Sequence, residues 1–148
     1  MNEQPPRPIS TLDTLGILVG KWAMVGTHPA FPSAVHGSST FKWLLDGTLL
    51  VWHFDWERPG PPSAVSVIGR DDPAETYTML YGDERGVGRI YEMTLVNETW
   101  KMWRPSPGFS QRMTGRFSDD GNTIVVRGQL SRDGANWDAD LNVTYTRE

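Results

Sequence analysis

Apolar and polar residues alternate along most of this chain with a period of two. The segment 52–57 reads Trp-His-Phe-Asp-Trp-Glu, so its three aromatic residues fall on one face of an extended strand and its polar residues on the other. Short segments of this kind follow one another from residue 21 onward, separated by turn residues. The pattern therefore predicts an all-β fold.

Ten alternating segments are long enough to be strands, and they cover residues 21–28, 36–45, 48–58, 63–70, 76–82, 87–95, 99–104, 110–117, 123–131 and 136–147. Asp-Gly pairs at 46–47, 120–121 and 133–134 tolerate the positive φ that tight hairpins need. The connections are too short for parallel crossovers, so successive strands are expected to be antiparallel neighbours. We predict a ten-stranded antiparallel up-and-down β-barrel, because closure leaves no strand edge unpaired.

A short helix is expected before the first strand. Ser10 and Asp13 form a capping pattern, Leu15 and Leu18 give the segment an apolar side, and Gly20 ends it. This helix would cover a few residues at most.

The length of 148 residues fits one domain, which we place at residues 10–148 after a flexible arm at 1–9. A net charge of −4 gives no basic surface for nucleic acid or an anionic membrane. The chain has no cysteine, and its histidines at 28, 36 and 53 lack the spacing of metal ligands, so no metal site is expected. A signal-peptide pattern is lacking, which indicates the cytoplasm, and a homodimer is left open.

Polar residues interrupt the apolar inner face at a few positions. Alternation places Arg89 and Tyr91 inward on one strand, Arg104 on the next and Gln111 on the one after, with Tyr81 and His28 close to strand ends. None of the predicted strands carries an inward carboxylate. A buried guanidinium without an anion is costly, so a ligand could supply the missing charge.

The remaining inward residues expected to line the barrel cavity are aromatic rings and methionines, namely Trp52, Phe54, Met79, Met102 and Met113. Such a wall suits a flat or apolar body, while a guanidinium suits a carboxylate or phosphate. The predicted partner is a small apolar or amphipathic molecule in the barrel cavity. In the opposing interpretation, Arg89 and Arg104 lie at the barrel mouth and pair with loop acids such as Asp83 or Glu84.

Several sequence stretches carry a resemblance to a known family. They are LVGKW (18–22), FKWLLDG (41–47), RIYEM (89–93), WKMWR (100–104), FSQR (109–112) and FSDDG (117–121). In these the chain resembles a bacterial family of uncharacterised calycin-like β-barrels, similar to lipocalins and nitrobindin. The resemblance implies that Trp22 plugs the closed end of the barrel. Nitrobindin-like proteins bind haem through a late histidine, and this chain has none after His53, so no cofactor is expected.

Three functions remain open from the sequence. The first is a carrier or sensor that binds an aromatic or amphipathic ligand. The second is a cofactor-free lyase, isomerase or cyclase, with Tyr91 or His28 as the acid-base group. The third is haem binding, for which His28 is the candidate ligand.

Overall fold

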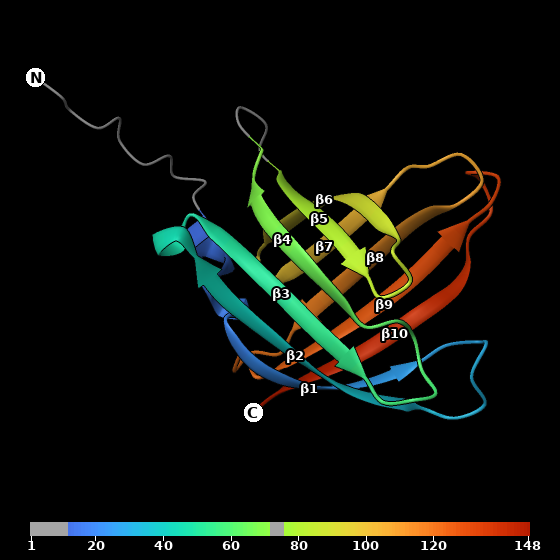
Figure 1. Cartoon of the computed structure of the whole chain (residues 1–148), viewed down its shortest axis with the longest axis horizontal. Coiled ribbons are helices and arrows are strands. Elements are labelled where there is room, and N and C mark those ends of the chain that lie inside the picture. The colour runs from blue at the N-terminus through green and yellow to red at the C-terminus, as the bar shows by residue number, and fades with distance from the viewer. Residues whose placement is uncertain (1–11, 72–75) are drawn as a thin grey trace, which may run out of the picture.

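Ten antiparallel strands follow one another around a closed barrel in the computed structural model, which describes residues 12–71 and 76–148 (Figure 1). Each strand pairs with its neighbours in sequence, and β1 closes the ring by pairing with β10. The predicted fold class is confirmed. The predicted arm at 1–9 lies outside the described residues. The strands are β1 Gly20–Thr27, β2 Val35–Leu44, β3 Leu49–Trp56, β4 Ala64–Arg70, β5 Tyr77–Asp83, β6 Gly88–Val96, β7 Thr99–Arg104, β8 Ser110–Phe117, β9 Thr123–Ser131 and β10 Asp138–Arg147.

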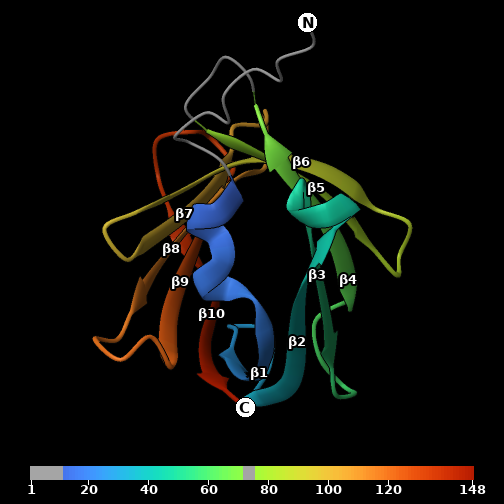
Figure 2. The same cartoon turned by 90° about the vertical axis from the view of Figure 1, so that its left-hand side faces the viewer.

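One end of the barrel is closed by η1, a 3-10 helix at Leu12–Leu18 whose leucines are buried (Figure 2). Trp22 follows at the start of β1 and is fully buried, with its Nε1 donating to the carbonyl of Leu18 at 2.8 Å. The guanidinium of Arg147 lies 4.1 Å from the centre of that indole ring and donates to the carbonyls of Val19 and Ile17. These contacts fix η1 and the ends of β1 and β10 together.

Aromatic residues fill the barrel above this closed end. Phe41 stacks on Trp52 with ring centres 5.0 Å apart, and Trp100 lies 5.2 Å from Trp52. Tyr145 packs against both indoles and is buried. Each such pair contributes roughly 0.5–1.5 kcal/mol beyond the burial of its area. A few large rings therefore fill this half of the barrel with packed side chains.

The last strand departs from the predicted alternation. Ala139 pairs with Gln129 and Asn142 pairs with Arg127, so two residues of β10 lie opposite the single residue Gly128 of β9. This β-bulge shifts the inward and outward positions that precede it. Strict alternation over 136–147 places Ala139 on the inner face together with Leu141 and Val143. The bulge makes this placement wrong, and Ala139 is exposed.

The same alternation over 136–147 places Trp137 on the inner face, and this placement is wrong as well. The strand begins one residue later, at Asp138, so Trp137 belongs to the preceding loop. Its ring lies 3.8 Å from the guanidinium of Arg112, an exposed residue on the outer face of β8.

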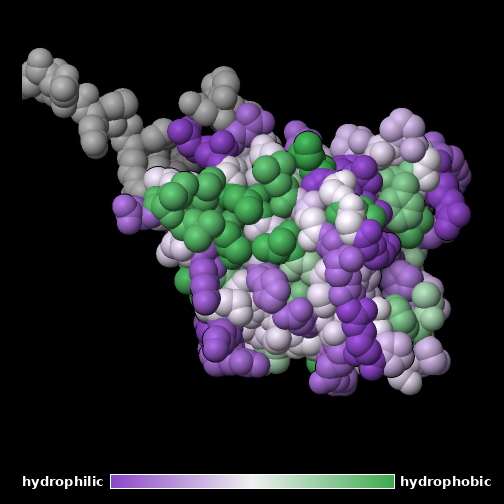
Figure 3. Space-filling view, in the orientation of Figure 1, coloured by the Kyte–Doolittle hydropathy of each residue, from purple (hydrophilic) through white to green (hydrophobic). Residues whose placement is uncertain are grey.

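The outer surface carries exposed apolar side chains. Figure 3 shows an apolar area over η2, a short turn at Leu45–Gly47, and the neighbouring strands. On the outer faces of β4, β5 and β6, Val67 is opposite Leu80 and Leu80 is opposite Ile90. A homodimer stays a prediction. Within the described residues, no helix is long and apolar enough to cross a membrane.

Candidate ligand-binding site

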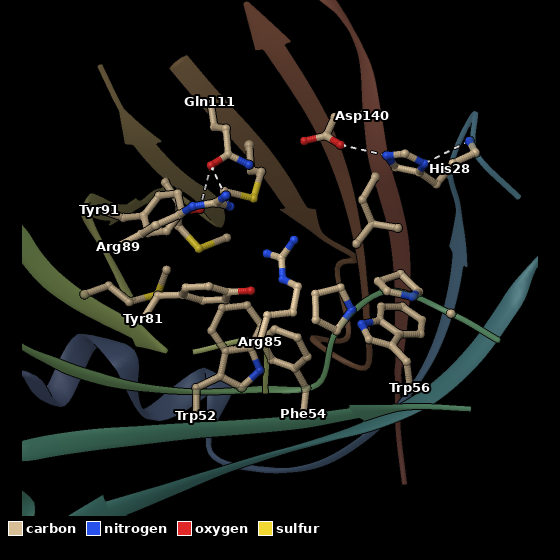
Figure 4. A pocket seen from close by; sticks show the side chains of 18 of the residues that line it. His28, Trp52, Phe54, Trp56, Tyr81, Arg85, Arg89, Tyr91, Gln111 and Asp140 are labelled. Atoms are coloured by element: carbon tan, nitrogen blue, oxygen red, sulfur yellow. Dashed lines mark hydrogen bonds and ion pairs between the residues drawn. The ribbon is translucent and has the colours of Figure 1, made fainter. Parts of the chain in front are cut away.

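A cavity of about 410 Å³ lies at the end of the barrel opposite η1 (Figure 4). Its walls are the inner faces of the strands, and its rim is formed by the loops that follow β1, β3, β5 and β7. This volume falls within the range of roughly 300–1,000 Å³ that is typical of small-molecule sites. All the sequence-predicted site residues except Arg104 line it.

The apolar walls of the cavity come from alternation on the central strands. On β3, Trp52, Phe54 and Trp56 point inward together, and the Trp52 and Phe54 ring centres are 5.1 Å apart. Methionines from β5, β7 and β8 complete the walls. Rings are rigid whereas methionine side chains adapt, so these walls suit a flat apolar molecule of variable outline. The methionines are Met79, Met102 and Met113.

A polar group projects into the cavity from β6 and β8. The hydroxyl of Tyr91 donates to Oε1 of Gln111 at 2.8 Å, and Nη1 of Arg89 lies 3.4 Å from the same oxygen. The guanidinium of Arg89 also lies 5.2 Å from the centre of the Phe109 ring. Burial raises the pKa of Tyr91, although the nearby Arg89 and Arg104 oppose that rise. At neutral pH the phenol is therefore a hydrogen-bond donor.

Arg104 does not line the cavity. It is half-buried at the end of β7, where its Nη1 lies 3.4 Å from the carbonyl oxygen of Phe109. Its charge nevertheless acts on Tyr91. Arg104 therefore acts on the site through its charge, whereas Arg89 lines the cavity itself.

The loop acids that the opposing interpretation assigned to these arginines have other partners. Asp83 pairs with Arg85, and Glu84 pairs with Arg58. Among the residues that the structure describes, neither Arg89 nor Arg104 forms an ion pair with a carboxylate. Two positive charges at this end of the cavity are thus without a carboxylate partner in that part of the chain.

Arg85 is a cavity residue that the sequence did not reveal. It belongs to the turn between β5 and β6, and its Nη2 lies 2.7 Å from Oδ2 of Asp83. The same carboxylate accepts the hydroxyl of Tyr81 at 2.7 Å. The Arg85 guanidinium holds the pKa of Asp83 well below its usual range, and burial together with Asp83 raises the pKa of Tyr81. Turn residues follow no alternation, so no pattern pointed to Arg85.

Asp140 corrects the expectation that no carboxylate faces inward. The bulge on β10 turns both Asp140 and Leu141 toward the cavity. Oδ1 of Asp140 lies 3.0 Å from Nε2 of His28, and Nδ1 of His28 accepts the backbone N–H of Ala30 at 3.0 Å. One signal could have revealed this bulge, because a glycine inside a strand, here Gly128, often marks one.

The cavity does not fit haem held by a histidine. Both ring nitrogens of His28 are engaged, by Asp140 and by the backbone of Ala30. His36 and His53 are exposed on the outer face, and His53 lies beside Asp55 at 3.6 Å. The described residues also contain no group of three or more His, Cys, Asp or Glu side chains that could hold a metal ion.

The fold and the position of the cavity define a calycin-like barrel. No protein-family model and no curated protein matches the chain. Two solved structures are similar to it in fold. Rv2717c from M. tuberculosis has a TM-score of 0.68 at 13% identity, covering 95% of this chain and 98% of that one. The S-type phycobiliprotein lyase CPES from Guillardia theta has a TM-score of 0.57 at 12% identity, covering 90% and 89%.

Proposed function

We propose that this barrel is a carrier or sensor that binds one small amphipathic molecule, with a flat apolar body and an anionic head. The observation that carries the proposal is the position of Arg89, which lies at the wall of an aromatic cavity without a carboxylate partner among the described residues. Arg104 adds a second positive charge, which acts on Tyr91 although its side chain does not line the cavity.

A guanidinium in an apolar environment loses its hydration, and this costs free energy. Such a group is stabilised when an anion completes its hydrogen bonds, and its planar fork matches a carboxylate or sulfonate through two parallel bonds. Gln111 supplies Arg89 with one neutral acceptor at 3.4 Å, so most N–H donors of the Arg89 guanidinium are left for a ligand. The rings of Trp52 and Phe54 would then cover the apolar body of the same molecule.

Anilinonaphthalenesulfonate tests this proposal, because it combines fused rings with one sulfonate. Its fluorescence is titrated against the wild-type protein, against Arg89→Gln and against Arg116→Gln, which removes an exposed arginine from the outer face of β8. Charge-assisted hydrogen bonds contribute about 1.5–3 kcal/mol, so Arg89→Gln should weaken binding about tenfold or more while Arg116→Gln leaves it unchanged. Equal affinities for all three proteins would overturn the proposal.

A cofactor-free enzyme remains the alternative, with Tyr91 or His28 as its acid-base group. Binding is favoured over catalysis because Tyr91 donates to Gln111, and both ring nitrogens of His28 are used within the protein. An acid-base group needs a free atom within hydrogen-bond reach of the reacting group. Turnover that is abolished by Tyr91→Phe or His28→Ala would favour the enzyme instead.

A further inference from the structure

We infer that Asp140 is a second recognition point, which selects ligands carrying a hydroxyl or N–H group at a position away from the anionic head. This inference rests on the proposed function and adds to it the chemical class of the ligand. Arg89 alone would bind any flat anion. Asp140 would favour those anions that carry a hydrogen-bond donor of their own.

The first observation concerns the free acceptor capacity of Asp140. Its side chain lines the cavity and is 17% exposed. An ionised carboxylate has about four acceptor positions. His28 is the one hydrogen-bond partner that the described residues give to this side chain. The remaining acceptor positions are therefore available to a donor group inside the cavity.

The second observation concerns the way His28 holds this carboxylate. Nδ1 of His28 accepts the N–H of Ala30, so the ring proton resides on Nε2 and is donated to Asp140. The loop after β1 thereby orients the carboxylate through the imidazole ring. Because both ring nitrogens are used, the pair acts as a fixed acceptor.

The third observation concerns the direction in which an anion would bind. Arg89 and Asp140 act on the pKa of Tyr91 in opposite senses, so both charges are felt within one cavity. In Figure 4 the His28–Asp140 pair and the group of Arg89, Tyr91 and Gln111 occupy separate parts of the pocket. Asp140 repels an anionic head and Arg89 attracts it. A ligand is therefore oriented with its head at Arg89 and its other end free to meet Asp140.

Three flat anions that differ at one position provide the test, namely cinnamate, para-hydroxycinnamate and para-methoxycinnamate. The hydroxyl can donate a hydrogen bond, whereas the methoxy group has the same oxygen but carries a methyl group in place of the proton and cannot donate. Isothermal titration calorimetry should show that the hydroxy compound binds about tenfold more tightly than the other two, as expected for a hydrogen bond to a charged acceptor. In Asp140→Asn this advantage should fall to about threefold or less, because a neutral amide is a weaker acceptor.

Two control variants separate this inference from the proposed function. Asp119→Asn removes an exposed carboxylate from the loop after β8 and should retain the full preference for the hydroxy compound. Arg89→Gln should weaken all three anions together. Circular dichroism checks that Asp140→Asn is folded, which is expected because its amide oxygen can still accept from His28.

Equal affinities of the three anions for the wild-type protein, or an unchanged preference in Asp140→Asn, would overturn the role of Asp140 and leave the anion site intact. Failure of all three anions and of anilinonaphthalenesulfonate to bind would overturn the proposed function together with the inference.

Discussion

Individual side chains reach the cavity by two routes, and only one of them follows the strand pattern. Arg89 and Tyr91 point inward because they are two residues apart on β6, as alternation requires. Arg85 reaches the cavity from a turn, and its charge is already compensated by Asp83. The two arginines should therefore contribute differently to anion binding.

Arg85→Gln should weaken anilinonaphthalenesulfonate binding by less than about threefold, against the tenfold or more expected for Arg89→Gln. The physical reason is that the Arg85 guanidinium already donates to the buried carboxylate of Asp83, which compensates its charge and leaves little of it for a ligand. Fluorescence titration of the two variants side by side measures this difference. A larger loss for Arg85→Gln would instead make the turn the main anion anchor.

Tyr145 provides a prediction about alkaline pH. Burial raises its pKa, so the folded protein keeps a proton that the unfolded chain releases near pH 10. The stability associated with this group is full below that pH and is lost as the pH rises from there toward the pKa of the folded state. The loss should be about 1.4 kcal/mol for each pH unit above 10.

Urea denaturation at pH 9 and near pH 11 checks this expectation, since both values bracket the unfolded pKa of about 10. Between these two pH values the free energy of unfolding should fall less in Tyr145→Phe than in the wild-type protein. An identical pH dependence in the two proteins would show that Tyr145 ionises normally in the fold.

At the scale of elements, the β10 bulge decides which groups the cavity contains. Gly128 makes the bulge possible, because a Cβ atom at that position would lie 2.4 Å from the carbonyl oxygen of Leu141. Its N–H lies 3.2 Å from Oδ1 of Asn142. The direction of Asp140 thus depends on a glycine of the neighbouring strand.

Gly128→Ala should destabilise the protein by about 1–3 kcal/mol, because the added methyl group forces the backbone of β10 to move. The same movement should reduce the preference for para-hydroxycinnamate. Thermal denaturation and calorimetry measure the two effects. Gly82→Ala on β5 is the control, because its Cβ would meet nothing within 4 Å and the change should be close to neutral. Equal stability of the two variants would argue against the strained contact.

The elements themselves were predictable to different degrees. All ten strands and their antiparallel order follow from the two-residue period and the Asp-Gly turns, because one face of each strand must be buried. Alternation also assigned the aromatic wall at Trp52 and Phe54. It failed at Asp140 because one extra residue reverses the faces, and at Arg85 because a turn has no faces. Both residues that alternation did not predict, Asp140 and Arg85, are charged residues of the cavity.

At the scale of the whole molecule, the residues that stabilise the fold and the residues proposed to bind a ligand lie at opposite ends of the barrel. The end covered by η1 is packed by Trp22 and Arg147, whereas the cavity opens at the other end among the loops. Changes at the closed end should therefore affect folding and leave ligand affinity unaltered.

Arg147→Gln should lower the free energy of unfolding by about 2 kcal/mol, through loss of the contact with the Trp22 ring and of charged hydrogen bonds to Val19 and Ile17. Urea denaturation measures this loss, and Arg116→Gln should change stability by less than about 0.5 kcal/mol. The affinity of folded Arg147→Gln for anilinonaphthalenesulfonate should equal that of the wild-type protein. A weakened affinity would show that the two ends are coupled.

The central claim is that the open end of the barrel holds an amphipathic anion by Arg89. A crystal structure of the complex with anilinonaphthalenesulfonate tests it most directly. The account predicts the sulfonate within hydrogen-bond distance of the Arg89 guanidinium and the naphthalene rings against Trp52 and Phe54. A probe found on the apolar outer surface over η2 and β4, with the cavity unchanged, would contradict it.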